Sequence, residues 1–160
     1  MNQARWFASA CCLADQVYIF AGWSNKDSYL NSIEKIGAGS LISNGRDRWE
    51  LIQTSPTILS PRKEPAVAPL NNTEIMIFGG YDKNSNNLGD VIVFDTKTKQ
   101  CRKAMSEGAS KFWALSNRCV QASNDKVIGL VTKDDYDREV AVFSWSKGAS
   151  AITVVKEFSD

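Results

Sequence analysis

Residues 62–81 have the sequence RKEPAVAPLNNTEIMIFGGY, and residues 5–23 have the similar sequence RWFASACCLADQVYIFAGW. Each stretch begins with an arginine, passes through small apolar residues to a polar turn, and then enters a short hydrophobic run. Each run ends at a pair of small residues, Ala21-Gly22 or Gly79-Gly80, and 58 positions separate the first members of the two pairs. Short apolar runs between polar turns, recurring at a fixed spacing, predict a repeat protein built from β-strands.

The sequence after each small pair also repeats. A polar loop leads through a leucine into a third strand, and a shorter fourth strand completes each unit. The predicted third strands are residues 30–36 and 88–94, and the predicted fourth strands are residues 49–52 and 101–104. In the second unit, Asp95-Thr96-Lys97-Thr98 is a predicted hairpin turn between the last two strands.

A third, more divergent copy occupies the rest of the chain. It has Val131-Thr132 where the other copies have their small pair. Its four predicted strands are residues 117–122, 127–131, 140–143 and 152–155. No stretch of the chain has a convincing helical period, so three units of four short strands predict an all-β protein.

These units resemble kelch repeats, which have about 50 residues, four strands, a strand ending in Gly-Gly and a later tryptophan. The resemblance is carried by Phe78-Gly79-Gly80-Tyr81, Arg62 after Pro61, Trp49, and the phrases LNSIEKI and LGDVIVFDTKT. It covers nearly the whole chain, although Ala21 replaces the first glycine of one pair and Cys101 stands where the second copy would have its tryptophan. The resemblance implies an all-β, partial kelch-type β-propeller with three four-stranded antiparallel blades.

The implied blades divide a single kelch-repeat domain that spans residues 1–160. They cover about residues 5–55, 62–106 and 115–158. Propellers close with four to eight blades, and a stack of three leaves an apolar face open at each end. We therefore expect completion in one of three ways: the chain is a segment of a longer propeller, two copies form a homo-dimer of three plus three blades, or another chain supplies the rest.

The composition excludes several classes of function. Nineteen Lys and Arg stand against 18 Asp and Glu, so a net charge of +1 gives no reason to expect nucleic acid or an anionic membrane as a partner. The chain has no histidine, which removes Ser-His-Asp and Cys-His catalysis and His-ligated metal sites. We expect no enzyme activity, no cofactor and no metal. The acidic run Asp134, Asp135, Asp137 is flanked by Lys133 and Arg138, which favours a solvated loop over a calcium site.

Four cysteines without a CxxC pair indicate small buried thiols in a reducing compartment. The sequence opens without a recognisable signal peptide, and its apolar runs are far shorter than the roughly 20 residues of a membrane helix. The expected location is cytoplasmic.

Candidate protein-binding residues fall in two places, because propellers bind through their rim loops while the strands supply rigidity. The loops after the second strands mix aromatic and charged residues: Trp23, Asn25, Lys26, Asp27 and Tyr29 in the first copy, and Tyr81, Asp82, Lys83 and Asn84 in the second. The starts of the first strands carry Arg5, Trp6, Arg62, Lys63 and Arg118. In kelch substrate receptors, residues at such starts face the peptide-binding mouth, although the arginines could instead tie neighbouring strands together.

The first copy has a longer segment between its last two strands, residues 37–48, which three glycines and mixed charge predict to be a flexible loop. Its Leu41 and Ile42 could dock on a partner or fold back on their own blade.

The leading hypothesis is a non-catalytic protein–protein interaction module, or a scaffold subunit of a larger assembly. The alternatives are part of a propeller enzyme, or a ubiquitin-ligase substrate receptor, whose other segments lie outside this chain. Actin bundling and carbohydrate binding through Trp6, Trp23 and Tyr81 also stay open.

Overall fold

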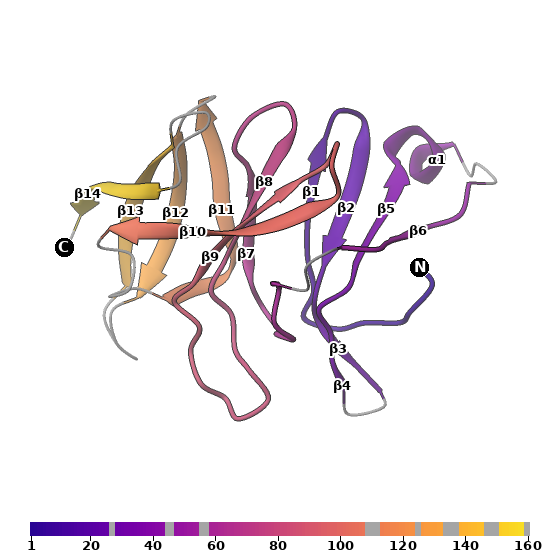
Figure 1. Cartoon of the computed structure of the whole chain (residues 1–160), viewed down its shortest axis with the longest axis horizontal. Coiled ribbons are helices and arrows are strands. Elements are labelled where there is room, and N and C mark those ends of the chain that lie inside the picture. The colour runs from indigo at the N-terminus through magenta and orange to yellow at the C-terminus, as the bar shows by residue number, and fades with distance from the viewer. Residues whose placement is uncertain are drawn as a thin grey trace.

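The structure is a computed structural model that describes residues 1–25, 28–43, 47–54, 58–107, 113–123, 126–132, 138–145 and 151–158. Its four-stranded units follow one another along the chain, and Figure 1 shows β10 reaching across from the second of them to β14 of the third. Lys26, Asp27 and the acidic run at 134–137 lie outside this described part.

Unit one is a four-stranded antiparallel sheet in the order β1-β2-β5-β6. Its strands are β1 (Ser9–Leu13), β2 (Gln16–Phe20), β5 (Ile33–Gly37) and β6 (Glu50–Ile52). Each strand pairs with the next one in the unit, which is the pattern predicted from the repeat. The loop after β2 forms a small sheet of its own from β3 (Trp23–Ser24) and β4 (Ser28–Tyr29), which the sequence did not predict.

Unit two repeats this order with β7 (Ala66–Pro69), β8 (Glu74–Phe78), β9 (Val91–Asp95) and β10 (Gln100–Glu107). Short polar side chains build its turns. The side-chain oxygen of Asn71 accepts the N–H groups of Thr73 and Glu74 before β8. The Asp95 carboxylate accepts those of Lys97 and Thr98, which confirms the predicted hairpin turn.

Unit three contains β11 (Trp113–Ser123), β12 (Lys126–Thr132), β13 (Arg138–Trp145) and β14 (Ala151–Phe158), paired antiparallel in chain order. The expectation of three separate four-stranded blades is wrong in one respect. The end of β10 pairs parallel with the start of β14, from Met105 opposite Ala151 to Glu107 opposite Thr153, and this seam joins units two and three into one eight-stranded sheet. Because β10 runs past the predicted residue 104 to Glu107, its free edge can reach β14.

The first strands of the units lie beside one another, with β7 between β1 and β11 (Figure 1). The core fills the space between the sheets of units one and two. There the Phe94 ring meets the rings of Tyr18 and Phe20 edge-on, with centroids 6.1 and 6.0 Å away. Ile75, Ile77, Ile92 and Phe20 are all fully buried in this layer. Burying a large apolar side chain contributes about 1.5–3 kcal/mol, so this layer holds the two units together.

Five residues of the segment that was expected to be a flexible loop are helical. Helix α1 (Ala38–Ile42) forms one short turn directly after β5, and Ile42 is 86% exposed. The two apolar side chains therefore do not fold back on their own unit. Among the described residues, no helix combines the length and the apolar character needed to cross a membrane.

Candidate functional site

The arginines that begin the repeat units are buried, and each one joins two separate segments of its unit through hydrogen bonds and an ion pair. We call each of these arrangements an arginine tie. Arg62 is fully buried, and its guanidinium donates to the carbonyl of Gly79 at 2.9 Å. The same group forms a bidentate pair with the Asp90 carboxylate at 2.7 and 2.8 Å. This geometry fixes the turn after β8 to the start of β9, because a paired guanidinium holds both partners in one plane.

Arg5 makes the equivalent contacts in unit one. Its guanidinium donates to the carbonyl of Ala21 at 2.9 Å and forms a salt bridge with Glu34, and both side chains of that pair are fully buried. Neither arginine is therefore presented to a partner. Arg5 and Arg62, which were considered as binding residues, have a structural role instead. The arginine ties hold the loops that follow β2 and β8.

The small pairs adopt backbone angles that favour glycine. Gly22 and Gly80 have φ values of +102° and +91°. A Cβ atom on Gly80 would lie 2.5 Å from the carbonyl oxygen of Lys63, and one on Gly22 would lie 2.8 Å from that of Trp6. The glycines therefore allow the start of each first strand to approach the chain after the small pair.

This close approach brings together the two groups of predicted binding residues. Trp6 pairs with Trp23 through two backbone hydrogen bonds of 2.8 Å, and Lys63 pairs with Tyr81 through bonds of 3.0 and 2.9 Å. In each unit, the segment just before the first strand thus lies against the loop after the second strand. The two units are also joined here, since the N–H of Glu64 donates to the carbonyl of Phe7 at 2.8 Å.

The side chains at this junction form a surface that we call the rim cluster: Trp6, Phe7, Trp23, Tyr29, Lys63 and Tyr81. The Trp6 and Trp23 ring centroids are 5.3 Å apart, and Trp6 is 47% exposed. The Lys63 ammonium lies 5.7 Å from the centroid of the Phe7 ring and 5.8 Å from that of Tyr81, within reach of a cation–π interaction with each.

Phe7 is the member of the rim cluster that sequence reasoning missed, although it is 57% exposed. Phe7 and Glu64 follow the repeat arginines at the same distance and share a positive φ, 52° and 56°. A large aromatic residue on such a position faces solvent, because the turn directs it away from the sheet. Aligning the residues two places after each arginine would have identified it.

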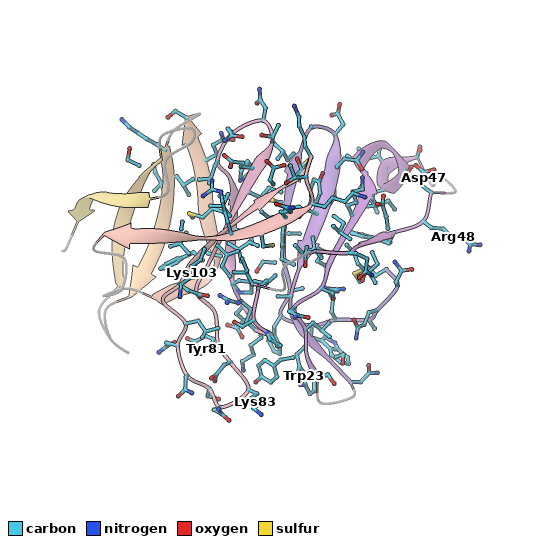
Figure 2. The ribbon with its side chains drawn as sticks, in the orientation of Figure 1. Trp23, Asp47, Arg48, Tyr81, Lys83 and Lys103 are labelled. Carbon is cyan, nitrogen blue, oxygen red and sulfur yellow. The ribbon has the colours of Figure 1, made fainter. Side chains whose placement is uncertain are left out.

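Two hollows open beside the rim cluster. One of about 290 Å³ is lined by Phe7, Trp23, Tyr29 and Lys63. Tyr29 also borders a second hollow of about 540 Å³, which is lined further by Ser28, Ser60, Pro61, Asp82, Lys83, Asn84 and Leu88. Figure 2 shows Trp23, Tyr81 and Lys83 at the same end of the molecule, where the β3–β4 hairpin and the loop before β9 project.

Asp82 organises its own loop. Its carboxylate accepts the N–H groups of Asn84 and Asn86, at 2.8 and 2.9 Å, and the side-chain amide of Asn86 at 3.0 Å. The hydrogen bonds from Asn86 lower the pKa of this carboxyl below its ordinary value, with smaller contributions from Asn84 and Lys83. Asp82 therefore shapes the second hollow, and Asn84 is exposed at its border.

The remaining predicted residues are not part of the rim cluster. Asn25 lines a separate hollow of about 450 Å³ together with Asn2, Ser24 and Glu34. Lys26 and Asp27 fall outside the described residues, and Arg118 lies in β11 with its side chain outside the described part.

The described residues hold no group of three or more Cys, Asp or Glu side chains that could ligate a metal. Cys11, Cys12 and Cys101 are free cysteines. Burial raises the pKa of Cys11 to about 12 and that of Cys101 to about 11, which keeps both thiols protonated and unreactive near neutral pH.

Comparison with protein families identifies the central unit. The family model described as the Kelch motif matches residues 64–106, which include all of β7, β8 and β9 and nearly all of β10. A search of curated proteins found no significant match to the chain. The matched residues include Gly79-Gly80, and Arg62 lies just before them. The chain therefore carries a kelch motif, as the sequence resemblance indicated, and its β7–β10 unit is a kelch repeat.

Proposed function

We propose that this chain is a non-catalytic protein-interaction module of the kelch-propeller type, acting as a scaffold subunit of a larger cytoplasmic assembly. The observation that carries the proposal is the rim cluster, to which unit one contributes the exposed Trp6 and Phe7 and unit two the half-buried Tyr81. Kelch motifs are in general associated with protein interaction, and that association supports the class of function.

The chemistry of the rim cluster favours a peptide that has an acidic residue next to a large apolar one. Exposed Trp and Tyr side chains are typical anchors of protein interfaces. No carboxylate of the described residues forms a salt bridge with Lys63, so its ammonium is available to an incoming anion. The 290 Å³ hollow beside it has room for one large side chain between Phe7 and Trp23.

The arginine ties explain how such a site keeps its shape without a ligand. The turns that carry Trp23 and Tyr81 are fixed by buried charge pairs and by backbone hydrogen bonds to the first strands. A surface held in advance loses less conformational freedom when a partner binds, which increases its affinity.

A peptide-display selection on the purified chain tests the proposal. We expect enrichment of peptides with Asp or Glu beside an aromatic or long aliphatic residue. Lys63→Gln keeps most of the side chain and removes its charge, and it should weaken binding of a selected peptide tenfold or more. Phe7→Ala should have a similar effect, because the residue is exposed and its loss leaves the core intact.

Lys97→Gln, on the exposed hairpin turn before β10, is the matched control and should bind like the unchanged chain. A selection that enriches no peptide, or peptides that bind the Lys63→Gln and Phe7→Ala variants as well as the unchanged chain, would contradict the proposal.

A further inference from the structure

The two hollows beside the rim cluster differ in their charged residues. The 290 Å³ hollow has one charged residue on its wall, Lys63. The 540 Å³ hollow is bordered by Asp82 and Lys83. Tyr29 forms part of the wall of both hollows. A ligand that leaves the first hollow at Tyr29 therefore enters the second one, where it meets a different set of charges.

The Asp82 carboxylate is held in place before any ligand binds. It accepts the side-chain amide and the backbone N–H of Asn86 and the backbone N–H of Asn84. These hydrogen bonds lower the pKa of the carboxyl, because they stabilise its charged form. No lysine or arginine of the described residues forms a salt bridge with it. Within the described part of the chain, Asp82 is therefore a fixed negative charge without an ion-pair partner.

Lys83 is the other charged residue at this hollow, and it differs from Asp82 in how it is held. Lys83 is exposed, at the end of the molecule where the loop before β9 projects (Figure 2). A long lysine side chain loses much of its rotamer freedom when a ligand fixes it, whereas a carboxylate already held by hydrogen bonds loses little. We therefore expect the fixed carboxylate to determine which charge the hollow accepts.

The walls of the 540 Å³ hollow suit a long basic side chain. Tyr29, Pro61 and Leu88 supply apolar surface, and Asp82 lies at the border. Lysine and arginine bury the methylene part of their side chains along apolar surface while the charged end stays with polar groups. An arginine can in addition stack on an aromatic ring such as that of Tyr29. One such side chain would lie along the apolar wall and reach the carboxylate.

From this arrangement we infer that the bound peptide carries a lysine or arginine that enters the 540 Å³ hollow and pairs with Asp82. The inference rests on the proposed function and adds a charge order to it. The acidic residue lies at Lys63, the large apolar residue fills the 290 Å³ hollow, and the basic residue lies beyond Tyr29. Opposite charges at the two ends select one direction of the peptide, because the reversed direction would place like charges together at both ends.

The charge order is tested with peptides from the display selection, whose affinity for the purified chain is measured by calorimetry. We expect the enriched peptides to carry Lys or Arg at a fixed spacing from the acidic residue, on the far side of the apolar one. A peptide in which the acidic and basic residues are exchanged has the same composition and net charge. It should bind at least about tenfold more weakly, because like charges then meet at both ends.

Variants of the chain test the contact at Asp82. Asp82→Asn removes the charge and keeps an oxygen that accepts the N–H groups of the loop, because Asn forms the same turn as Asp. It should weaken binding of the selected peptide about threefold to fivefold, as for a partly exposed ion pair. With a peptide whose basic residue is replaced by Gln, Asp82→Asn should have no effect. Lys83→Gln should instead increase the affinity, because it removes a charge that repels the basic residue.

Asp95→Asn is the matched control and should bind like the unchanged chain. The Asp95 carboxylate also accepts two backbone N–H groups in a turn, and it lies outside both hollows.

Enriched peptides without a basic residue would overturn the inference. So would equal affinity for the two charge orders, an unchanged affinity of Asp82→Asn, or a loss of affinity in Lys83→Gln, which would place an anion in the second hollow. In each of these cases the proposed function stands if Lys63→Gln and Phe7→Ala still weaken binding. If those two variants bind normally while Asp82→Asn binds weakly, the proposed site at Lys63 fails and the contact at Asp82 is retained.

Discussion

Units one and two place the same arginine tie in different surroundings. In unit two, Arg62 pairs with Asp90, whose side chain is 22% exposed, and every nitrogen of the guanidinium has an acceptor. In unit one, Arg5 pairs with a fully buried Glu34 and its Nε has no partner among the described residues. Both units keep the contact from the arginine to the turn carbonyl, at Ala21 or Gly79, while the carboxylate comes from different positions on the next strand.

The position of the carboxylate follows from strand geometry. Glu34 lies two residues beyond Ser32, and Ser32 corresponds to Asp90 in the repeat. Side chains two residues apart point to the same face of a strand, so either position can reach the arginine. Glutamate has the longer side chain that this displacement requires.

The largest loss in free energy of unfolding is expected when the arginine of a tie is replaced. Arg5→Met would leave the Glu34 carboxylate buried with only the Asn2 backbone and side-chain amides as donors, and it should destabilise the chain by about 3–5 kcal/mol. Arg62→Met should cost less, because the Asp90 carboxylate can be hydrated. Urea unfolding of both variants measures the difference. Equal losses, or a larger loss for Arg62→Met, would contradict the contrast between the two ties.

An intermediate effect is expected at the second glycine of each pair. Gly80→Ala and Gly22→Ala should each destabilise the chain by about 1–2 kcal/mol from backbone conformation alone. The clash of the new methyl group adds to this loss, and it is more severe at Gly80, where the carbonyl oxygen would be 2.5 Å away. The midpoint of thermal unfolding should therefore be lower for Gly80→Ala than for Gly22→Ala. Gly39→Ala, with open space around it, is the control and should change the midpoint little.

The smallest effect concerns an ion-pair network between the units. Glu50 of β6 lies 3.1 Å from Lys99 of unit two and 3.3 Å from Lys35 of its own unit. The pairing is partly exposed, so Glu50→Gln should cost only about 0.2–1 kcal/mol. The hydrogen bond from Lys99 lowers the pKa of Glu50 in the folded chain. Its contribution is therefore present above the unfolded pKa and disappears as the pH falls through the lower folded value.

Urea midpoints of the unchanged chain and of Glu50→Gln, measured at pH 7 and at pH 2, test this assignment. The difference between the two proteins should be present at pH 7 and vanish in acid, and 1 M salt should reduce it at pH 7. If the urea midpoints of the two proteins still differ at pH 2, the stability lost in Glu50→Gln comes from packing and not from charge.

Much of the fold could be predicted from the sequence because its determinants are local. The run Val17 to Phe20 and the run Ile75 to Phe78 are strands as predicted, since apolar residues between turns specify a buried strand directly. The same reasoning failed at residues 38–42, where five residues are too few to show a helical period.

The pairing of β10 with β14 could not be predicted either. Any edge strand offers the same backbone groups, and the choice of partner depends on where distant segments meet in space. For the site, composition and position suggested Trp6, Trp23, Lys63 and Tyr81, which the structure brings together. The burial of Arg5 and Arg62 depended on Glu34 and Asp90, far along the chain, and a single sequence contains no signal that links them.

The parallel seam between β10 and β14 also bears on the order in which the chain folds. Its first pair joins Met105 to Ala151, 46 positions apart, whereas the antiparallel pairs within each unit join neighbouring strands. Closing a longer loop costs more chain entropy, and distant pairings form after local ones. We expect the hairpins of units two and three to form first and the seam to close last. In hydrogen exchange under native conditions, the amides of residues 105–107 should then exchange sooner than those of β8 and β9.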